Sequence, residues 1–332
     1  MEQDIARVRR GLVLGKFLPP HAGHEFLVRF ASGFADQLTV LVCSLPRDPI
    51  PGELRYAWTR ELFPHVRIVH VADELPQEPA EHPRFWPIWR DVVCRAAGGP
   101  LDYIFASETY GIRLAEEVGA RFIPADLARG QVPVSGTRIR QQPLKYWDYL
   151  PPCVRPHFVR RVCLVGPEST GKSVLAARLA AHFRTRYVAE FARELLNLKH
   201  GVCDPADISD IARGQQAAED ALARQANRIL ICDTDALLTT VWSEMLFGSC
   251  PAEVRDLAAS RSYDLYLLLD VDVPWVDDGQ RFLAARRPEF FARCRQRLEE
   301  LRRPYQIVGG DWEQRFVLAR DAIACVLREP EP

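Results

Sequence analysis

The octapeptide GPESTGKS, residues 166–173, constrains the fold of this chain more than any other feature of its sequence. It fits the pattern G-x-x-x-x-G-K-[ST], follows the apolar run RVCLV and precedes the helix-forming run VLAARLAAHF. Backbone N–H groups of such a loop, with the helix N-terminus after it, surround phosphate oxygens. The motif therefore predicts a strand–loop–helix unit that binds ATP or GTP, with Lys172 as a catalytic cation on the terminal phosphates and Ser173 on Mg²⁺. The other loop residues expected to bind the nucleotide are Gly166, Ser169, Thr170 and Gly171.

Short apolar runs alternate with amphipathic stretches along both halves of the chain. The apolar runs, which are rich in Val, Ile and Leu, lie at 11–15, 38–44, 66–71, 101–107, 120–125, 161–166, 228–233, 263–270 and 305–310. The helical candidates lie at 22–35, 54–63, 86–97, 109–118, 171–183, 190–198, 205–226, 235–246, 251–260, 288–302 and 312–327. Strand–helix alternation of this kind predicts parallel, doubly wound sheets covered by helices.

A proline-rich segment separates two such series. The run QQPLKYWDYLPPCVRPH, residues 141–157, breaks the alternation and crowds three aromatic residues into 146–149. A length of 332 residues also suits two domains better than one. We therefore predict an α/β protein of two domains, 1–145 and 159–332, joined by a packed connector at 146–158.

Acidic residues follow two of the apolar runs in the second half. Asp233 ends the run RILICD, where a carboxylate on the Mg²⁺ side is expected, and Asp235 lies just beyond it. At least one of them is predicted to be catalytic, although either could instead cap the helix that begins near residue 236. In AEFARELL, Glu190 and Arg193 lie three residues apart on one helical face. They are candidates for substrate binding or, equally, for a surface ion pair.

The segment DVPWVDDGQRF places a tryptophan in a polar loop after a strand. Trp275, with Asp278 beside it, could stack on a planar base or could anchor the loop to the core. Further along, Arg286 and Arg287 precede a helix. They could neutralise charge on a transferred phosphoryl group, or they could be solvated surface residues.

The stretch GKFLPPHAGHEFL, residues 15–27, places two histidines three residues apart after the first apolar run. A metal site would need further ligands, and no other histidine lies at a recognisable zinc spacing. A structural role suits one histidine better than a pair flanked by Lys16 at a strand–helix junction. We therefore favour an anion site in which His21 and His24 donate hydrogen bonds to phosphate oxygens at a helix N-terminus.

A second anion-binding pattern closes the same half of the chain. In VSGTRIRQQ, Ser135 occupies a helix-cap position, and Thr137 and Arg140 lie in the first turns. Backbone amides and guanidinium groups there would form another phosphate site. Phosphate-binding patterns at both ends of one doubly wound domain suggest a nucleoside triphosphate held between them.

Composition excludes several classes of protein. The net charge of −1 offers no basic excess for general nucleic-acid binding, and no apolar run is long enough to span a bilayer. The N-terminus MEQDIARVRRG lacks the apolar segment of a signal peptide. Nine cysteines without a C-x-x-C pair indicate reduced thiols, so a cytoplasmic protein is expected.

These motifs together resemble a known family. GKFLPPHAGH with the later SGTRIR is similar to the H-x-G-H nucleotidyltransferases, in their nicotinamide-mononucleotide branch. With PLKYWDYLPPCVRPHF, GPESTGKS, CDTDALLTT and WVDDG in this order, the chain resembles the bifunctional NadR-type proteins from about residue 11 to 328. Such proteins join an adenylyltransferase to a ribosylnicotinamide kinase. The resemblance implies a Rossmann-like nucleotidyltransferase domain followed by a P-loop kinase domain.

The resemblance implies NAD salvage with ATP at two sites and Mg²⁺. Nicotinamide riboside would be phosphorylated to nicotinamide mononucleotide, which would then be adenylylated to NAD. Trp86 and Trp89 match an aromatic pair of the family, one of which should stack on nicotinamide, and Trp275 looks like the platform in the kinase half. The residues that would hold the triphosphate in the first domain are His21, His24, Lys16, Arg140, Ser135 and Thr137.

The resemblance also leaves alternatives open. Some members carry an N-terminal helix-turn-helix repressor region, but here the catalytic motif begins at Gly11, so DNA binding is not expected. Only the kinase half could be active, with the first domain a nucleotide sensor or a weak adenylyltransferase. A regulator, a homo-oligomer and a functional link to a vitamin transporter are also compatible with this family.

Overall fold

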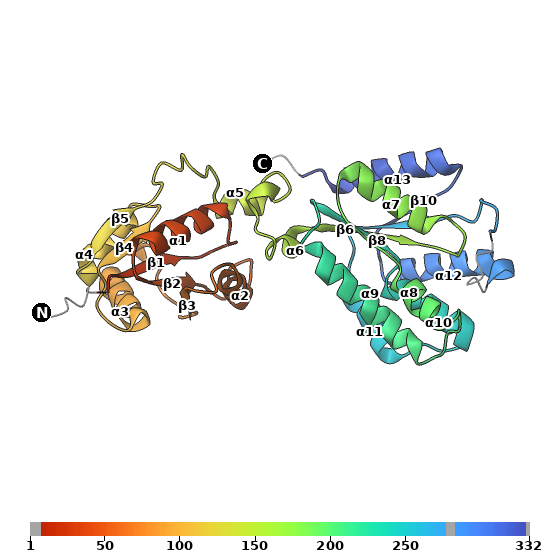
Figure 1. The fold of residues 1–332 in the computed structure, drawn as a ribbon, viewed down its shortest axis with the longest axis horizontal. Helices are drawn as coiled ribbons and strands as arrows, with labels where there is room; N and C mark the ends of the chain where they lie inside the picture. The colour runs from red at the N-terminus through yellow and green to blue at the C-terminus, as the bar shows by residue number, and fades with distance from the viewer. Residues whose placement is uncertain (1–7, 277–282, 330–332) are drawn as a thin grey trace, which may run out of the picture. The chain divides into compact units, whose positions relative to one another are not determined.

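The computed structural model describes residues 8–276 and 283–329, which form two compact α/β units, Met1–Val154 and Arg155–Pro332 (Figure 1). Each unit has its own five-stranded parallel sheet and its own hydrophobic core. The predicted fold class is therefore confirmed. None of the helices in the described part of the chain combines the length and the hydropathy that a membrane span requires.

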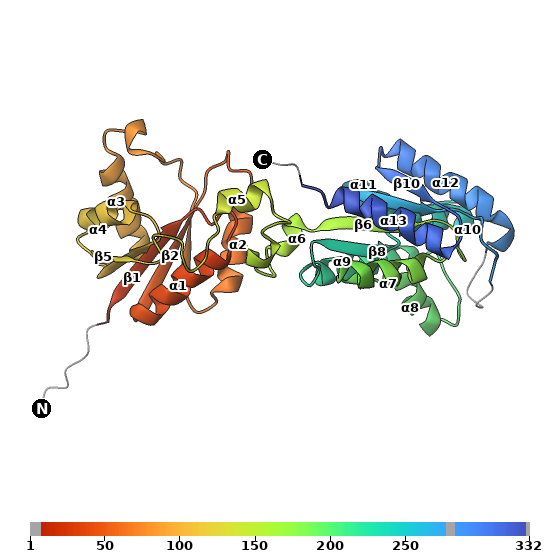
Figure 2. The ribbon, with the colours of Figure 1, turned by 90° about the horizontal axis from the view of Figure 1, so that it is seen from above.

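The first sheet has the strand order β3-β2-β1-β4-β5. Alternate residues of its strands face opposite layers: Leu12 and Leu41 pack against α3 and α4, whereas Val13 and Val40 pack against α1. Figure 2 shows α1 on one side of this sheet and α3 and α4 on the other. Its strands are β1 (Arg10–Gly15), β2 (Gln37–Cys43), β3 (Arg67–Val71), β4 (Tyr103–Ala106) and β5 (Arg121–Pro124). Its helices are α1 (Ala22–Phe34), α2 (Gly52–Leu62), α3 (Phe85–Ala97), α4 (Tyr110–Val118) and α5 (Gly136–Gln141).

The second sheet has the strand order β10-β9-β6-β8-β7. Leu164 and Leu267 face the layer formed by α7 and α13, and Figure 1 shows α9 to α12 on the opposite side. Its strands are β6 (Arg160–Val165), β7 (Tyr187–Val188), β8 (Ile229–Asp233), β9 (Leu265–Leu269) and β10 (Tyr305–Val308). Its helices are α6 (Arg155–Phe158), α7 (Lys172–Phe183), α8 (Phe191–Leu198), α9 (Asp207–Ala223), α10 (Ala236–Phe247), α11 (Ala252–Ser260), α12 (Arg287–Glu300) and α13 (Trp312–Val326).

The aromatic segment after α5 packs within the first unit. Trp147 is 1% exposed, Leu150 and Val154 are also buried, and the Cys153 thiol lies 4.0 Å from the Trp58 carbonyl. Most of the expected connector thus contributes to the core of the first unit, and the compact units divide at residues 154 and 155.

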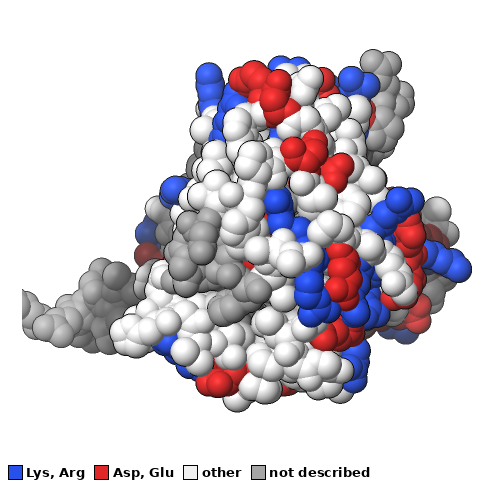
Figure 3. Space-filling view, turned by 90° about the vertical axis from the view of Figure 1, so that its right-hand side faces the viewer, with Lys and Arg blue, Asp and Glu red and all other residues white. Residues whose placement is uncertain are grey.

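Exposed helix surfaces of the second unit carry paired charges. On α12, Arg293 lies 3.0 Å from Glu289, and Arg295 lies 2.9 Å from Glu299. Figure 3 shows Lys and Arg beside Asp and Glu at the top and at the right of the displayed face. Such pairs add little stability, but they keep an exposed surface polar.

Candidate active sites

Each unit has a cavity at the carboxyl ends of its central strands. In the first unit the cavity has a volume of about 920 Å³ and begins where β1 and β4 end, at residues 14–18 and 107–110. These neighbouring strands lead to opposite layers of the sheet, which is where ligands bind in open α/β folds. In the second unit a cavity of about 580 Å³ lies between the phosphate loop and α8, α9 and α10. Both volumes suit small-molecule ligands.

His21 forms the N-cap of α1 in the first cavity. Its Nδ1 accepts a hydrogen bond from the Gly23 N–H at 3.1 Å. Because Nδ1 is the acceptor, the ring proton is assigned to Nε2, which remains available as a donor. The His24 ring lies 3.9 Å from the His21 ring and stacks on Phe17, and its own Nδ1 is buried without a hydrogen-bond partner. The pair therefore presents hydrogen-bonding groups that the described protein residues do not satisfy.

Burial keeps both imidazoles neutral. It lowers the pKa of His21 to about 4, with a further contribution from the charge of Arg129. Burial also lowers the pKa of His24 well below its usual value, and His21 and Arg129 add to the effect. At neutral pH the two rings act as hydrogen-bond donors rather than as cations. Among the described residues, no group of three or more His, Cys, Asp or Glu side chains could hold a metal, so the metal interpretation of this pair gains no support.

Positively charged groups line the same cavity. The Lys16 side chain is 46% exposed, and its Nζ lies 3.9 Å from Asp48 Oδ1. Arg140 donates to the Leu18 carbonyl and, at 3.3 Å, to the Thr137 hydroxyl. The structure therefore brings the first and last predicted anion-binding segments of the unit together. The predicted residues that line this cavity are Lys16, His21, His24, Trp86, Trp89, Ser135, Thr137 and Arg140.

A buried arginine holds the Lys16 segment in place. Arg55 is fully buried and donates to the carbonyl oxygens of Lys16, Cys43 and Ile50. It also pairs with Asp48 at 2.7 Å. Sequence reasoning missed Arg55, because an arginine on a helix normally indicates a solvated face.

The two tryptophans of α3 differ in burial and in hydrogen bonding. Trp89 is 8% exposed, and its indole N–H donates to the Pro76 carbonyl at 2.9 Å. Trp86 is only partly buried and meets Phe85 edge to face. Of the pair, Trp86 is therefore the more accessible to a planar ligand.

The phosphate loop of the second unit is already folded. Gly166 and Gly171 adopt positive φ angles of 137° and 81°, and a side chain at Gly166 would meet the Leu269 carbonyl at 2.8 Å. The ammonium group of Lys172 donates to the carbonyl oxygens of Gly166 and Pro167, at 3.0 and 2.9 Å. These two hydrogen bonds hold the Lys172 side chain along the phosphate loop.

Two buried arginines fix the loop from behind. Arg287 donates to the Val273 carbonyl at 3.0 Å and to the Ser169 carbonyl at 3.2 Å. Arg315 donates to the Thr170 carbonyl at 3.2 Å. Arg287 is therefore a buried support of the phosphate loop and not a solvated surface residue, and its role in neutralising a phosphoryl group stays a prediction.

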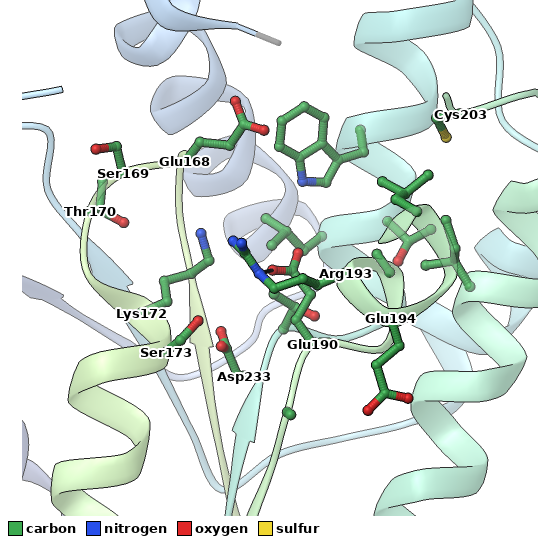
Figure 4. A pocket seen from close by; sticks show the side chains of 18 of the residues that line it. Glu168, Ser169, Thr170, Lys172, Ser173, Glu190, Arg193, Glu194, Cys203 and Asp233 are labelled. Atoms are coloured by element: carbon green, nitrogen blue, oxygen red, sulfur yellow. Dashed lines mark ion pairs between the residues drawn. The ribbon is translucent and has the colours of Figure 1, made fainter. Parts of the chain in front are cut away.

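Asp233 is the buried carboxylate of the second cavity. It is 1% exposed, and neither of its oxygens has a hydrogen-bond partner of good geometry. Burial raises its pKa to about 6, and the charge of Glu190 adds to the shift, whereas Lys172 and the Ser173 hydroxyl oppose it. Figure 4 shows Lys172, Ser173 and Asp233 directed toward the same space. An unsatisfied carboxylate beside a hydroxyl fits Mg²⁺, which is commonly held by few protein ligands with phosphates and water.

Asp235 is not part of this site, which corrects the prediction that it could be catalytic. One of its oxygens accepts from the Leu238 N–H at 3.0 Å and caps α10, and the other accepts from the Tyr266 hydroxyl at 2.8 Å. The residue is 2% exposed and is not among those that line the cavity. Its position after a strand is shared by metal-side carboxylates and helix caps, so the sequence could not separate them.

Glu190 and Arg193 face each other at the start of α8. Their side chains lie 3.9 Å apart and both line the cavity (Figure 4). The buried Gln215 of α9 supports this end of α8, because its carbonyl oxygen accepts from the Phe191 N–H at 2.9 Å. Its amide group also donates to the backbone carbonyls of Asp233 and Thr234. Sequence reasoning missed Gln215.

Trp275 is the predicted aromatic platform of the second unit, and it stays a prediction. Trp275 is not among the residues that line the cavity, and the Arg287 guanidinium lies 5.8 Å from its ring centre. Asp278 lies outside the described residues. Trp242 of α10 lines the cavity instead, with its ring 4.5 Å from that of Phe290. A tryptophan inside an apolar helix gave no signal that distinguishes a site residue from a core residue.

Comparisons with known proteins agree with both halves of this description. A family model described as an AAA domain matches residues 161–315. The trifunctional NAD biosynthesis/regulator protein NadR of Escherichia coli is 30% identical over 334 residues, which cover 92% of this chain and 80% of that protein. The chain belongs to the NadR family. The family resemblance drawn from the motifs is thereby confirmed.

Further similarities extend the NadR assignment. The nicotinamide-nucleotide adenylyltransferase of Methanospirillum hungatei is 30% identical over 149 residues, which cover 44% of this chain and 84% of that protein. Two solved NadR structures, one in complex with NAD and AMP-PNP and one with NR, superpose with TM-scores of 0.78 and 0.80. Each is 22% identical and covers 98% of both chains, so the NadR fold extends over both units.

Proposed function

We propose that this chain is a bifunctional enzyme of NAD salvage. Its second unit phosphorylates nicotinamide riboside with ATP, and its first unit adenylylates the resulting mononucleotide to NAD. The observation that carries the proposal is the presence, in one member of the NadR family, of two cavities that each gather phosphate-binding groups at strand ends. Both reactions are transfers in which a protein mainly positions groups and neutralises charge.

In the second unit, the loop N–H groups and Lys172 hold the β- and γ-phosphates of ATP. The 5′-hydroxyl of the riboside attacks the γ-phosphorus, and ADP leaves. Ser173 and Asp233 would hold Mg²⁺, which neutralises charge between the phosphates when bound. Glu190 and Arg193 hold the acceptor from the opposite wall, and Trp242, rather than Trp275, offers its ring to the nicotinamide.

In the first unit, the phosphate of nicotinamide mononucleotide attacks the α-phosphorus of a second ATP, and pyrophosphate leaves. The attacking group is already an anion, so no general base is required. The neutral rings of His21 and His24 donate hydrogen bonds to the phosphates, while Lys16 and Arg140 neutralise the leaving pyrophosphate. Ser135 and Thr137 assist at the start of α5, and Trp86 offers its face to the nicotinamide.

The chemistry of the cysteines supports a location in the cytoplasm. All nine cysteines are free thiols, and most of them are buried. Free thiols persist in a reducing compartment, and ATP is supplied there. The homo-oligomer and the link to a vitamin transporter stay predictions.

The proposal is tested by mass analysis of products formed from Mg²⁺, excess ATP and nicotinamide riboside alone. We expect NAD as the end product, with ADP and pyrophosphate released. Accumulation of nicotinamide mononucleotide would instead assign the first unit to sensing. Recovery of unmodified riboside would overturn the kinase assignment.

A further inference from the structure

Trp312 stands apart from the other tryptophans of the chain. The structure describes all seven, and Trp312 is the most exposed of them, with 56% of its surface accessible. It is the first residue of α13, immediately after the turn that follows β10. Single exposed apolar side chains are common on protein surfaces, so the exposure of Trp312 matters here only together with the place of its ring.

The Trp312 ring lies directly on the phosphate loop. A side chain placed on Gly171 would come within 2.5 Å of the indole, so the ring packs against the bare backbone of that glycine. Gly171 has a φ angle of 81° and immediately precedes Lys172. A nucleotide whose phosphates bind this loop would therefore bind beside an exposed aromatic ring.

Several contacts fix the ring relative to the loop. Asp311 and Gln314 form a capping box at the start of α13, and Arg178 of α7 donates to the Trp312 carbonyl at 3.5 Å. The buried Arg315 joins the Gly310 carbonyl to the Thr170 carbonyl, with distances of 2.8 and 3.2 Å. The first turn of α13 and the phosphate loop are thus held together before any ligand binds, which lowers the entropic cost of stacking.

The position of Trp312 also separates it from the acceptor. The described residues that line the acceptor cavity come from the loop, α7, α8, α9, α10 and the ends of β7 and β8, and they do not include Trp312. We infer that Trp312 is the stacking platform for the base of the nucleoside triphosphate in the second unit and that it sets a preference for purines. This inference rests on the proposed kinase function.

Stacking explains which bases are preferred. A purine overlaps an indole over two fused rings, whereas a pyrimidine overlaps it over one, so ATP and GTP should bind more tightly than CTP and UTP. Stacking alone does not separate adenine from guanine. We therefore expect wild-type protein to discriminate by ring size.

The test compares Trp312→Ala, Trp312→Phe and the matched control Leu318→Ala, which removes another exposed apolar side chain from α13. In riboside phosphorylation, Trp312→Ala should raise the KM for ATP by roughly tenfold, leave kcat and the KM for riboside unchanged, and erase the preference for ATP over CTP. Trp312→Phe should recover most of the affinity, and Leu318→Ala should match wild type. An unchanged KM for ATP, or an increase confined to the KM for riboside, would overturn the inference.

A second readout does not depend on the riboside reaction. ADP and CDP are titrated into the full-length protein, and tryptophan fluorescence is compared between wild type and Trp312→Phe. The difference between the two proteins reports Trp312 alone, and it should be quenched by ADP far more than by CDP. If ADP quenches the difference in fluorescence but the protein phosphorylates no riboside, Trp312 is still the platform for the base, and riboside is not the acceptor. Absence of the signal in a protein that does phosphorylate riboside would reject the platform.

Discussion

At the scale of single residues, the histidines of the first cavity have separate tasks. His21 uses Nδ1 to cap α1, whereas the Nδ1 of His24 has no hydrogen-bond partner. Replacing His21 therefore disturbs the cap of α1 as well as the ligand, whereas replacing His24 removes a stacked ring but no hydrogen bond of its Nδ1. His24 is consequently the cleaner probe of catalysis.

We expect His24→Ala to abolish NAD formation and to leave riboside phosphorylation intact, because the ring lies in the first unit and would donate to the phosphates in the transition state. Loss of one such donor typically lowers kcat by about 10²–10³-fold. Coupled assays for pyrophosphate and for ADP on the same preparation would measure both activities. Loss of both activities in a folded variant would contradict the separation of tasks between the units.

Protonation of Asp233 should lower the kinase activity at acidic pH. Burial raises the pKa of this carboxyl to about 6, and the group must be ionised to hold Mg²⁺. As the pH falls through that value the carboxyl takes up a proton, so kcat/KM should fall below about pH 6 and level off above it. The pH profile of riboside phosphorylation measures this limit, and Asp233→Asn should remove most of the activity at every pH. A profile that stays flat down to pH 5 would show that Asp233 is not required in its ionised form.

At the scale of secondary-structure elements, most of the fold could be predicted from the sequence. The nine predicted strands agree with the structure to within two residues at each end, because buried parallel strands are continuous apolar runs bounded by turn residues. The two-residue strand β7 was missed, since Tyr187 and Val188 are too few to form a pattern. The phosphate loop was predictable because its backbone geometry requires specific residues at fixed spacing.

Other parts of the site depend on contacts between distant elements. The carboxylate of Asp235 is occupied by Leu238 and by Tyr266, which lies 31 residues away. The Arg55 guanidinium reaches the Lys16 carbonyl across 39 residues. No local sequence pattern indicates such partners. In the sequence alone, the helix cap Asp235 therefore cannot be told from a catalytic acid, and the buried Arg55 cannot be told from a surface arginine.

Gln215 should position α8 for the acceptor. Gln215→Met keeps the approximate volume but leaves the Phe191 N–H and two backbone carbonyls without their partner. We expect the second unit to lose about 1–3 kcal/mol of unfolding free energy and the KM for riboside to rise, while the KM for ATP stays unchanged. Urea denaturation and steady-state kinetics measure the two effects, with Gln216→Met of the same helix as control. Equal changes in both KM values would assign Gln215 to general stability rather than to α8.

At the scale of the whole molecule, the two units have separate cores. Within residues 8–276 and 283–329 the two sheets share no strand, and the clusters that pack on each sheet draw their residues from one unit. The segment after α5 belongs to the first compact unit as far as Val154, and Trp147 is buried there. Damage to one core is therefore expected to leave the other unit folded.

We expect Trp147→Ala to destabilise the first unit by about 3–5 kcal/mol, as is typical when a large buried aromatic side chain is removed. Calorimetry should show one transition shifted to lower temperature and a second transition unchanged. Riboside phosphorylation should persist at temperatures where NAD formation is lost. A single shifted transition with simultaneous loss of both activities would show that the two units unfold together.

The strand order has a consequence for synthesis on the ribosome. All strands of the first sheet lie within residues 10–124, so that unit can fold before most of the second unit has been translated. The central strand β6 of the second sheet must wait for β9, which is translated about a hundred residues later. At about 5–20 residues per second this delay lasts roughly 5–20 s. β8 is translated earlier and can pair with one side of β6, so the apolar strand that leads into the phosphate loop lacks its second neighbour until β9 follows.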